Sequence, residues 1–310
     1  MTEPLPLVQV DETELKVPRL GLGTAHIGKK GEAEAVAIVQ RALEVGIAFL
    51  DTAPLYRTEP LLGLALAGVP RDSYVLATKV GRLPDGQGRY QPDYSRDGIL
   101  KSFELSLKTL GVDRIDILHI HDPDHHYDQA LHEAYPALAE LRRQGVIQAV
   151  GSGMNQWQML ADFAQNADFD CFLLAGRYTL LEQNSLEGLE IIRQTHTSIF
   201  AGGVYNTGIL ATGATTNATY NYRLAPPEIM DKARHLEAIC TRYGVPLNAA
   251  AVQFAAAHPA ITSLVLGADA ADQINENLQA FFTPIPDAFW EDIRAEGLIE
   301  SGAPTPKAVP

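Results

Sequence analysis

Short apolar runs rich in β-branched residues alternate with longer segments in which apolar residues recur every three or four positions. Runs of the first kind are typical of buried strands, and segments of the second kind are typical of helices with one buried face. The predicted strands span residues 19–23, 48–52, 75–79, 115–121, 147–151, 171–175, 198–202 and 263–267. The predicted helices span residues 33–45, 59–67, 97–110, 129–143, 158–166, 185–194, 227–243 and 270–279, with an extra helix at 247–257.

Eight strands, each followed by a helix, form the repeat of a closed parallel barrel. A doubly wound sheet shows the same alternation but needs a glycine-rich phosphate turn after an early strand. The nearest candidate, Gly21-Leu22-Gly23-Thr24-Ala25-His26, has His26 at the third glycine position, so that fingerprint fails. We therefore expect an α/β fold, a (β/α)8 TIM barrel, as a single domain over residues 1–310 with its core at 17–298.

Two further segments complete the predicted organisation. Residues 7–10 and 14–17 predict a short N-terminal hairpin that plugs the barrel floor. Residues 301–310 form a polar, proline-rich tail that we expect to be mobile.

Composition narrows the setting of the protein. The 310 residues carry a formal net charge of −14, and no apolar run is long enough to cross a membrane. An acidic chain repels a phosphate backbone, so we expect neither nucleic acid nor a membrane as a partner. The first residues lack the basic and apolar segments of a secretion signal, which predicts a cytoplasmic location. Cys171 and Cys240 form no CxxC motif and are expected to be reduced. We expect a monomer or a small homo-oligomer.

Polar residues gather at predicted strand ends, where the catalytic groups of parallel barrels lie. Asp51 and Tyr56 belong to the second strand end, Lys79 to the third, and His119 and His121 to the fourth. A free phenol has a pKa near 10, and a neighbouring ammonium group lowers it. Asp51 holding Lys79 charged, with Lys79 tuning Tyr56, would therefore make an acid or base, and a histidine would orient the substrate oxygen.

Other interpretations stay open at this level. Taken singly, Asp51 could cap a turn, Lys79 could be a solvated charge, and Tyr56 could be a loop aromatic. Potential metal ligands also crowd the fourth strand and its loop, namely His119, His121, Asp122, Asp124, His125 and His126. The second and third strand ends add only Asp51 as a ligand, which argues against a metal enzyme.

The motifs at these strand ends resemble those of the aldo-keto reductase family. They are Leu20-Gly21-Leu22-Gly23-Thr24, Asp51-Thr52-Ala53-Pro54-Leu55-Tyr56, Thr78-Lys79-Val80 and Asp116-Ile117-Leu118-His119-Ile120-His121-Asp122-Pro123. The resemblance covers about residues 19–278 and implies a nicotinamide-dependent oxidoreductase with Asp51, Tyr56, Lys79 and His121 as its catalytic tetrad. The family places its histidine just before the residue that precedes proline, which selects His121 over His119.

The resemblance also implies a cofactor site in the loops. Ser152 and Asn155 fall where the family holds the carboxamide, and Tyr178 falls where an aromatic ring stacks on the nicotinamide. Residues 203–210 resemble the loop around the pyrophosphate, and 266–277 the adenosine segment. The expected cofactor-binding residues are Gly23, Thr24, Ser152, Asn155, Tyr178, Val204, Tyr205, Asn206, Gly208, Leu210, Gly267, Ala268, Asp269, Gln273, Glu276 and Asn277.

One departure from the family pattern bears on the choice of cofactor. Many members place a cation at the position of Asp269, and often arginine at that of Gln273, to pair with the 2′-phosphate of NADP. A carboxylate repels that phosphate and accepts a hydrogen bond from a ribose hydroxyl instead. We therefore expect NAD as the cofactor, with NADP as the alternative.

Within the family, Asp93-Tyr94-Ser95-Arg96-Asp97 and Gly153-Met154-Asn155-Gln156 are most similar to the aldose 1-dehydrogenase branch, with pyridoxal-oxidising members also similar. This resemblance implies a sugar or aldehyde substrate and oxidation of an aldose at C1 to the lactone. The expected substrate contacts are His26, Tyr90, Tyr94, Trp157 and Tyr205. An NADPH-dependent aldehyde or ketone reductase and a non-catalytic cofactor-binding module stay open as alternatives.

Overall fold

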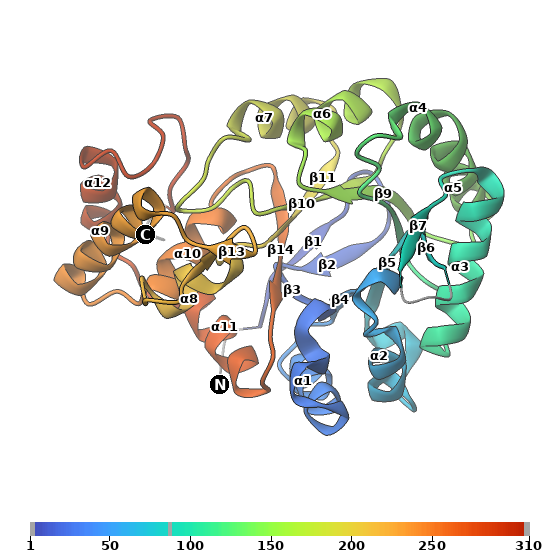
Figure 1. Ribbon diagram of the computed structural model, residues 1–310, viewed down its shortest axis with the longest axis horizontal. Coiled ribbons are helices and arrows are strands. Elements are labelled where there is room, and N and C mark those ends of the chain that lie inside the picture. The colour runs from blue at the N-terminus through green and yellow to red at the C-terminus, as the bar shows by residue number, and fades with distance from the viewer. Residues whose placement is uncertain (1–3, 86–88, 307–310) are drawn as a thin grey trace.

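The structure of the chain, a computed structural model, describes residues 4–85 and 89–306. Its centre is a closed barrel of eight parallel strands surrounded by helices (Figure 1). The barrel strands are β3 (Leu20–Gly23), β4 (Phe49–Asp51), β5 (Val75–Val80), β8 (Ile117–His121), β9 (Ala149–Met154), β10 (Cys171–Ala175), β11 (Ser198–Gly202) and β14 (Ile261–Gly267). Each pairs with the next in this order, and β14 closes the ring against β3. The predicted (β/α)8 barrel is confirmed.

The outer helices follow the predicted ranges closely. They are α1 (Glu32–Glu44), α2 (Glu59–Leu66), α3 (Arg96–Leu110), α6 (Trp157–Asn166), α7 (Leu186–Gln194), α9 (Pro227–Tyr243), α10 (Leu247–Ala256) and α11 (Asp272–Phe282). Helix α3 shows why sequence signals located these ends. Its N-cap Ser95 accepts a hydrogen bond from the Gly98 N–H, and Gly111 ends it with φ 66°.

Several elements differ from the prediction. The helix expected at 129–143 is built from α4 (Tyr127–Gln129), a π-helical turn η4 (Ala130–Ala134) and α5 (Tyr135–Arg143). Pro136 in the first turn of α5 has no N–H to donate, which removes one helical hydrogen bond there. The sequence prediction missed α12 (Asp287–Ala295), which buries Trp290 and packs on α9. The remaining short elements are η1 (Thr24–Lys30), η2 (Pro54–Tyr56), η3 (Arg71–Ser73), η5 (Asn206–Gly208), α8 (Ile209–Thr212) and α12 (Asp287–Ala295).

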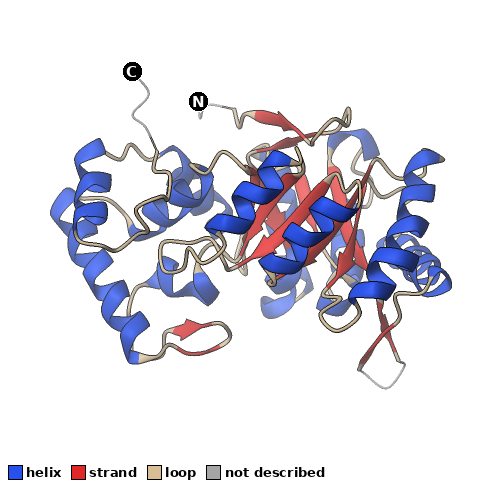
Figure 2. Cartoon of the chain, turned by 90° about the horizontal axis from the view of Figure 1, so that it is seen from above, coloured by secondary structure: helices blue, strands red, loops and turns tan. Residues whose placement is uncertain are grey.

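Three hairpins mark the two ends of the barrel. Hairpin β1–β2, which the sequence predicted, lies at one end, and two hairpins that it missed lie at the other (Figure 2). Their strands are β1 (Leu7–Gln9), β2 (Lys16–Pro18), β6 (Arg82–Pro84), β7 (Tyr90–Pro92), β12 (Thr219–Tyr220) and β13 (Arg223–Leu224). Because β6 follows β5 and β12 follows β11, the last two hairpins flank the mouth at the carboxyl ends of the strands.

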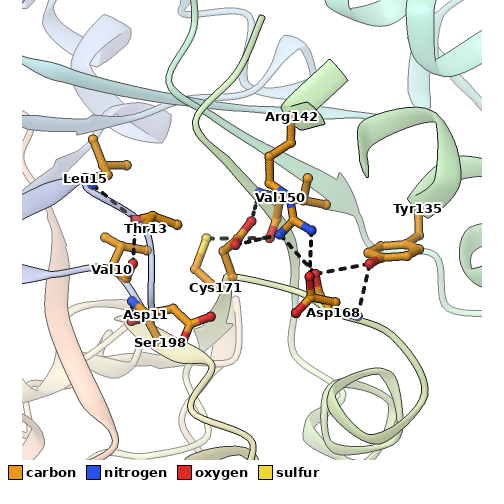
Figure 3. Close-up of polar contacts among 11 residues, drawn as sticks. Val10, Asp11, Thr13, Leu15, Tyr135, Arg142, Val150, Asp168, Cys171 and Ser198 are labelled. Atoms are coloured by element: carbon orange, nitrogen blue, oxygen red, sulfur yellow. Dashed lines mark hydrogen bonds and ion pairs between the residues drawn. The ribbon is translucent and has the colours of Figure 1, made fainter. Parts of the chain in front are cut away.

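Hairpin β1–β2 closes the floor of the barrel. Val10, Leu15 and Val17 are buried against the interior residues Phe49, Ala77, Ile117, Ala149, Cys171, Leu173, Phe200 and Val265. The main-chain N–H of Asp11 in the hairpin turn donates to Ser198 Oγ at 2.8 Å, which ties the turn to β11 (Figure 3). This apolar plug excludes water from the interior below the mouth.

A polar network lies to one side of the plug (Figure 3). Arg142 donates to Asp170 Oδ1 at 2.6 Å and to Asp168 Oδ2 at 2.7 Å. Burial, and then the charge of Asp170, raise the pKa of Asp11 to about 6. Cys171 and Cys240 are both buried, free thiols, and burial raises the pKa of each, so they stay protonated as expected.

The C-terminal segment packs on α12 over the part that the structure describes. Arg294 donates to the Ser301 and Ala303 carbonyl oxygens, at 2.9 and 3.1 Å. Ala303 is buried, so the described part of the predicted mobile tail is attached to α12 through Arg294. The rest of that tail, residues 307–310, lies outside the described residues.

Candidate active site

Strand alternation places three ionisable groups inside the mouth. Every second residue of a barrel strand faces the interior. Strands β4, β5 and β8 each give one residue to the interior apolar cluster, namely Phe49, Ala77 and Ile117. Asp51 and Lys79 follow two positions later in β4 and β5, and His121 follows four positions later in β8. All three side chains therefore point inward at the end opposite the floor.

Lys79 and Asp51 form a buried ion pair. Lys79 Nζ donates to Asp51 Oδ1 and Oδ2 at 2.8 and 2.6 Å, and to the Thr52 carbonyl oxygen at 2.8 Å. Lys79 is 1% exposed and Asp51 is 3% exposed. Burial lowers the pKa of the Lys79 ammonium, but Asp51 and Tyr56 together outweigh burial and hold that pKa above its ordinary value. Lys79 is therefore a fixed cation inside the barrel, as the strand-end pattern predicts.

Tyr56 faces this cation. It lies in turn η2, which begins at Pro54 just beyond β4. Its ring centroid is 4.8 Å from Lys79 Nζ and 5.9 Å from the His121 ring, which it meets edge-on at 85°. Burial raises the pKa of the Tyr56 phenol, and Lys79 lowers it only in part. The phenol is half-buried and protonated at neutral pH, whereas the sequence led us to expect a lowered pKa.

The structure also separates the two histidines of β8. His121 is buried beside Tyr56, and burial followed by the charge of Lys79 lowers its pKa well below the ordinary value. Its imidazole is therefore neutral. His119 lies deeper and is fully buried, and neither ring nitrogen has a partner among the described residues. Gly151 makes room for it, since a Cβ there would lie 2.2 Å from His119 Nδ1.

Two of the predicted cofactor segments meet at one side of the mouth, because they follow the neighbouring strands β11 and β14. The Tyr205 hydroxyl donates to Asn277 Oδ1 at 2.7 Å, which links the loop after β11 to helix α11. Asn277 Nδ2 in turn donates to the Gly267 carbonyl oxygen at 3.5 Å. The Asp269 N–H donates to Gln273 Oε1 at 2.8 Å, and Gln273 Nε2 donates back to Asp269 Oδ1 at 3.2 Å. The two segments are thus joined before any ligand binds.

Residues of these loops fit a nicotinamide dinucleotide. Asn206 is 3% exposed, yet its side-chain Nδ2 and Oδ1 have no partner among the described residues. A buried polar group left without a partner costs about 1–3 kcal/mol, so this amide is suited to a polar ligand. Asn206 and Gly208 hold φ at 46° and 108°, which turns the loop sharply around it. Asn155 lies across the mouth, where its Nδ2 donates to the Ala175 carbonyl oxygen at 2.6 Å.

The other predicted cofactor residues fall into two groups. Gly23, Gly267, Asp269, Gln273 and Glu276 are half-buried or exposed at the strand ends and on α11. Buried beneath them are Thr24, Val204, Leu210 and Ala268. Thr24 Oγ1 is 3.4 Å from Thr58 Oγ1, within hydrogen-bond range, so its hydroxyl faces the protein.

Two predicted cofactor residues lie elsewhere. Ser152 is fully buried, and its hydroxyl donates to the Ile120 carbonyl oxygen at 3.0 Å. Strand β9 extends to Met154, so alternation turns Ser152 to the outer face of the barrel. Tyr178 is also buried and stacks on Phe254, with ring centroids 5.1 Å apart. Neither side chain reaches the mouth as predicted.

The predicted substrate residues divide in the same way. Tyr90 is half-buried, and its hydroxyl donates to the Pro54 carbonyl oxygen at 2.6 Å, so it lies against the turn that carries Tyr56. His26 is exposed and lies close to Gly267. Tyr94 is 1% exposed and holds the β8 backbone, while Trp157 packs on α7. Packing therefore takes up the buried Tyr94 ring fully and the half-buried Trp157 ring in part.

Sequence reasoning also missed two charged pairs at the mouth. Arg82 Nη1 donates to Asp122 Oδ2 at 2.9 Å, and Lys30 Nζ lies 3.1 Å from Asp269 Oδ1. Arg82 comes three residues beyond the predicted end of its strand, which was the only signal available. Within the described residues, no group of three His, Cys, Asp or Glu side chains could hold a metal ion. None of the described helices is long and apolar enough to cross a membrane.

Comparison with known proteins agrees with this geometry. The aldo/keto reductase family matches residues 19–296, so the chain belongs to that family of oxidoreductases. Pyridoxal 4-dehydrogenase of Microbacterium luteolum is 38% identical over 93% of this chain and 96% of its own length. D-threo-aldose 1-dehydrogenase of a Pseudomonas species is 36% identical, over 94% and 96%. L-galactose dehydrogenase of Arabidopsis thaliana is 30% identical, over 86% and 85%.

Solved structures extend the likeness to three dimensions. An aldo-keto reductase of Bacillus halodurans in its holo form has a TM-score of 0.81 at 27% identity, over 96% of this chain and 98% of that one. The apo form of the same enzyme has a TM-score of 0.74. The present backbone is thus more similar to the holo form. Enzymes of this family use NAD(P)(H).

Proposed function

We propose that the protein is an NAD-dependent aldose 1-dehydrogenase that uses Tyr56 as its general acid and base. The observation that carries the proposal is the Asp51–Lys79 pair, whose ammonium faces the Tyr56 ring beside a neutral His121. Sequence identity to an aldose 1-dehydrogenase over most of the chain supports the same reaction class.

Each residue then has a defined task in oxidation. The C1 hydroxyl of the sugar lies against Tyr56 and His121, and the phenolate form of Tyr56 takes its proton. Lys79 stabilises that phenolate, because its positive charge is fixed by Asp51. Neutral His121 hydrogen-bonds the reacting oxygen and orients it. The loop residues around Asn155 and Asn206 would hold the nicotinamide, which would supply the acceptor for the hydride from C1, so that the sugar would become the lactone. In reduction, Tyr56 returns the proton.

The first experiment measures absorbance at the reduced-nicotinamide band. The protein is mixed with NAD or NADP and with L-fucose, L-galactose, D-arabinose or pyridoxal. We expect reduction of NAD by one stereochemical series of aldoses. If no sugar reduces either cofactor but simple aldehydes oxidise NADPH, the result would favour a reductase. If the protein neither reduces NAD or NADP nor oxidises NADPH, the result would favour a cofactor-binding module.

The choice of NAD rests on Asp269, and replacing it with arginine tests that choice. In the native chain the carboxylate opposes a 2′-phosphate, and it also engages the nearby cation of Lys30. In Asp269→Arg, both cations would be free to pair with the phosphate. We expect the ratio of kcat/KM for NADP to that for NAD to rise at least about tenfold.

Asp231→Arg is the matched control for Asp269→Arg. It makes the same charge change on α9, where Asp231 pairs with Arg234 on the exposed side of the helix. This variant should keep the native cofactor ratio. An unchanged ratio in Asp269→Arg would mean that Asp269 does not select the cofactor.

A further inference from the structure

A second ion pair lies directly beside the tetrad histidine. Arg82 Nη1 donates to Asp122 Oδ2 at 2.9 Å, and the same oxygen is 3.6 Å from His121 Nε2. The Arg82 and Asp122 side chains are 32% and 25% exposed, whereas the Asp51–Lys79 pair is buried. The Arg82–Asp122 pair is therefore open to a molecule that enters the mouth.

The backbone holds Asp122 in an unfavourable conformation to place its side chain there. Its φ is 39°, a left-handed value that costs a non-glycine residue about 1–2 kcal/mol. Its N–H donates to the Gly153 carbonyl oxygen at 3.0 Å. The Tyr94 hydroxyl donates to the carbonyl oxygens of both Asp122 and His121, at 2.8 and 2.7 Å. A partly exposed ion pair contributes only about 0–1 kcal/mol, so it does not explain this arrangement by stability alone.

The chemistry of the pair matches neighbouring hydroxyl groups. A carboxylate offers about four acceptor sites and a guanidinium five donors, so the single bond between them leaves capacity on both. A sugar hydroxyl can donate to the first group and accept from the second. A simple aliphatic aldehyde has no group beside its reacting carbon that could use either.

We propose that Asp122 and Arg82 bind the hydroxyl at C2 of the substrate and so select polyhydroxylated substrates over plain aldehydes. The inference rests on the proposed function in that His121 holds the C1 oxygen. Because Asp122 Oδ2 lies 3.6 Å from His121 Nε2, two substrate oxygens held by these two atoms would belong to adjacent carbons. A substrate without that hydroxyl would cover the pair and leave its remaining donor and acceptor positions without partners.

The test measures binding and turnover separately. D-arabinose, D-ribose and their shared C2-deoxy analogue, 2-deoxy-D-ribose, are titrated calorimetrically into the NAD-loaded Tyr56→Phe protein, in which turnover is blocked. Adding Asp122→Asn should weaken the tighter-binding of the two pentoses about 10- to 100-fold, as for the loss of a charge-assisted hydrogen bond. The 2-deoxy sugar should change less than about threefold. Arg82→Gln should show the same selective loss.

Asp124→Asn is the matched control, because it neutralises an exposed carboxylate in the same loop and should change neither sugar. Circular dichroism and NAD affinity verify that each variant is folded. Equal losses for the pentose and its deoxy analogue, or no loss, would overturn the inference while leaving the proposed function standing. So would failure of the Tyr56→Phe protein to bind any of the three sugars. Selective loss of binding in a protein whose native form oxidises no aldose would uphold the inference and overturn the proposed reaction.

Discussion

Replacing Tyr56 by phenylalanine is expected to lower kcat at least about a hundredfold while leaving cofactor affinity unchanged. The substitution removes only the phenol oxygen, and the ring can keep its positions beside Lys79 and the edge of His121. Steady-state assays measure the loss of turnover. Quenching of protein fluorescence by the reduced cofactor measures its binding.

The native enzyme should also show a pH dependence set by this phenol. Burial holds the pKa of Tyr56 above its ordinary value of 10.0, despite the opposing charge of Lys79. Oxidation needs the phenolate, which forms above that pKa, so kcat/KM for the sugar should keep rising with pH up to 10. Reduction needs the neutral phenol and should be constant over the same range.

Tyr243→Phe is the control for Tyr56→Phe. Its hydroxyl donates to Asp292 on the outside of the barrel, between α9 and α12. Losing that hydroxyl should leave kcat and its pH profile unchanged. If Tyr56→Phe retained most of the native kcat, another group would have to carry the proton.

The sequence brought the four residues of the proposed tetrad together because its signals are local and periodic. Asp51 and Lys79 end runs of buried strand residues, and alternation alone sends both side chains inward. His121 is the last residue of β8, and Tyr56 lies in the short turn just after β4. Little chain therefore separates either residue from its strand, and the strand fixes the direction of the side chain. The eight barrel strands were predictable for the same reason.

The predictions for Ser152 and Tyr178 failed because the exact extent of a strand decides which face of the barrel a side chain occupies. Strand β9 runs three residues beyond its predicted end, so Ser152 lies inside the strand and turns outward. Gly176, with φ 70°, breaks the alternation after β10 and sends Tyr178 toward Phe254. Tyr94 and the hairpins at the mouth depend on contacts between distant segments. No periodicity in the sequence records such contacts.

Replacing Asp51 by asparagine is expected to destabilise the folded protein by about 3–5 kcal/mol, because it leaves the buried Lys79 ammonium without its carboxylate. Burial would then place the folded-state pKa of Lys79 below its unfolded value near 10.4. The folded variant would bind fewer protons than the unfolded chain, so its stability should rise with pH between those two values. Urea denaturation at pH 7 and pH 9.5 should show a smaller deficit at the higher pH.

The double variant Asp51→Leu with Lys79→Met separates stability from function. Removing both charges leaves no ion unpaired, so the double variant should be about as stable as the native chain, although turnover is lost. Glu190→Gln, which breaks the exposed pair with Arg193, is the control and should leave the stability nearly unchanged, because solvent screens that pair. A double variant as unstable as Asp51→Asn would show that the pair holds the barrel together. A stable but inactive one would mean that the chain retains a buried ion pair for the proton chemistry of Tyr56, since packing alone could replace it.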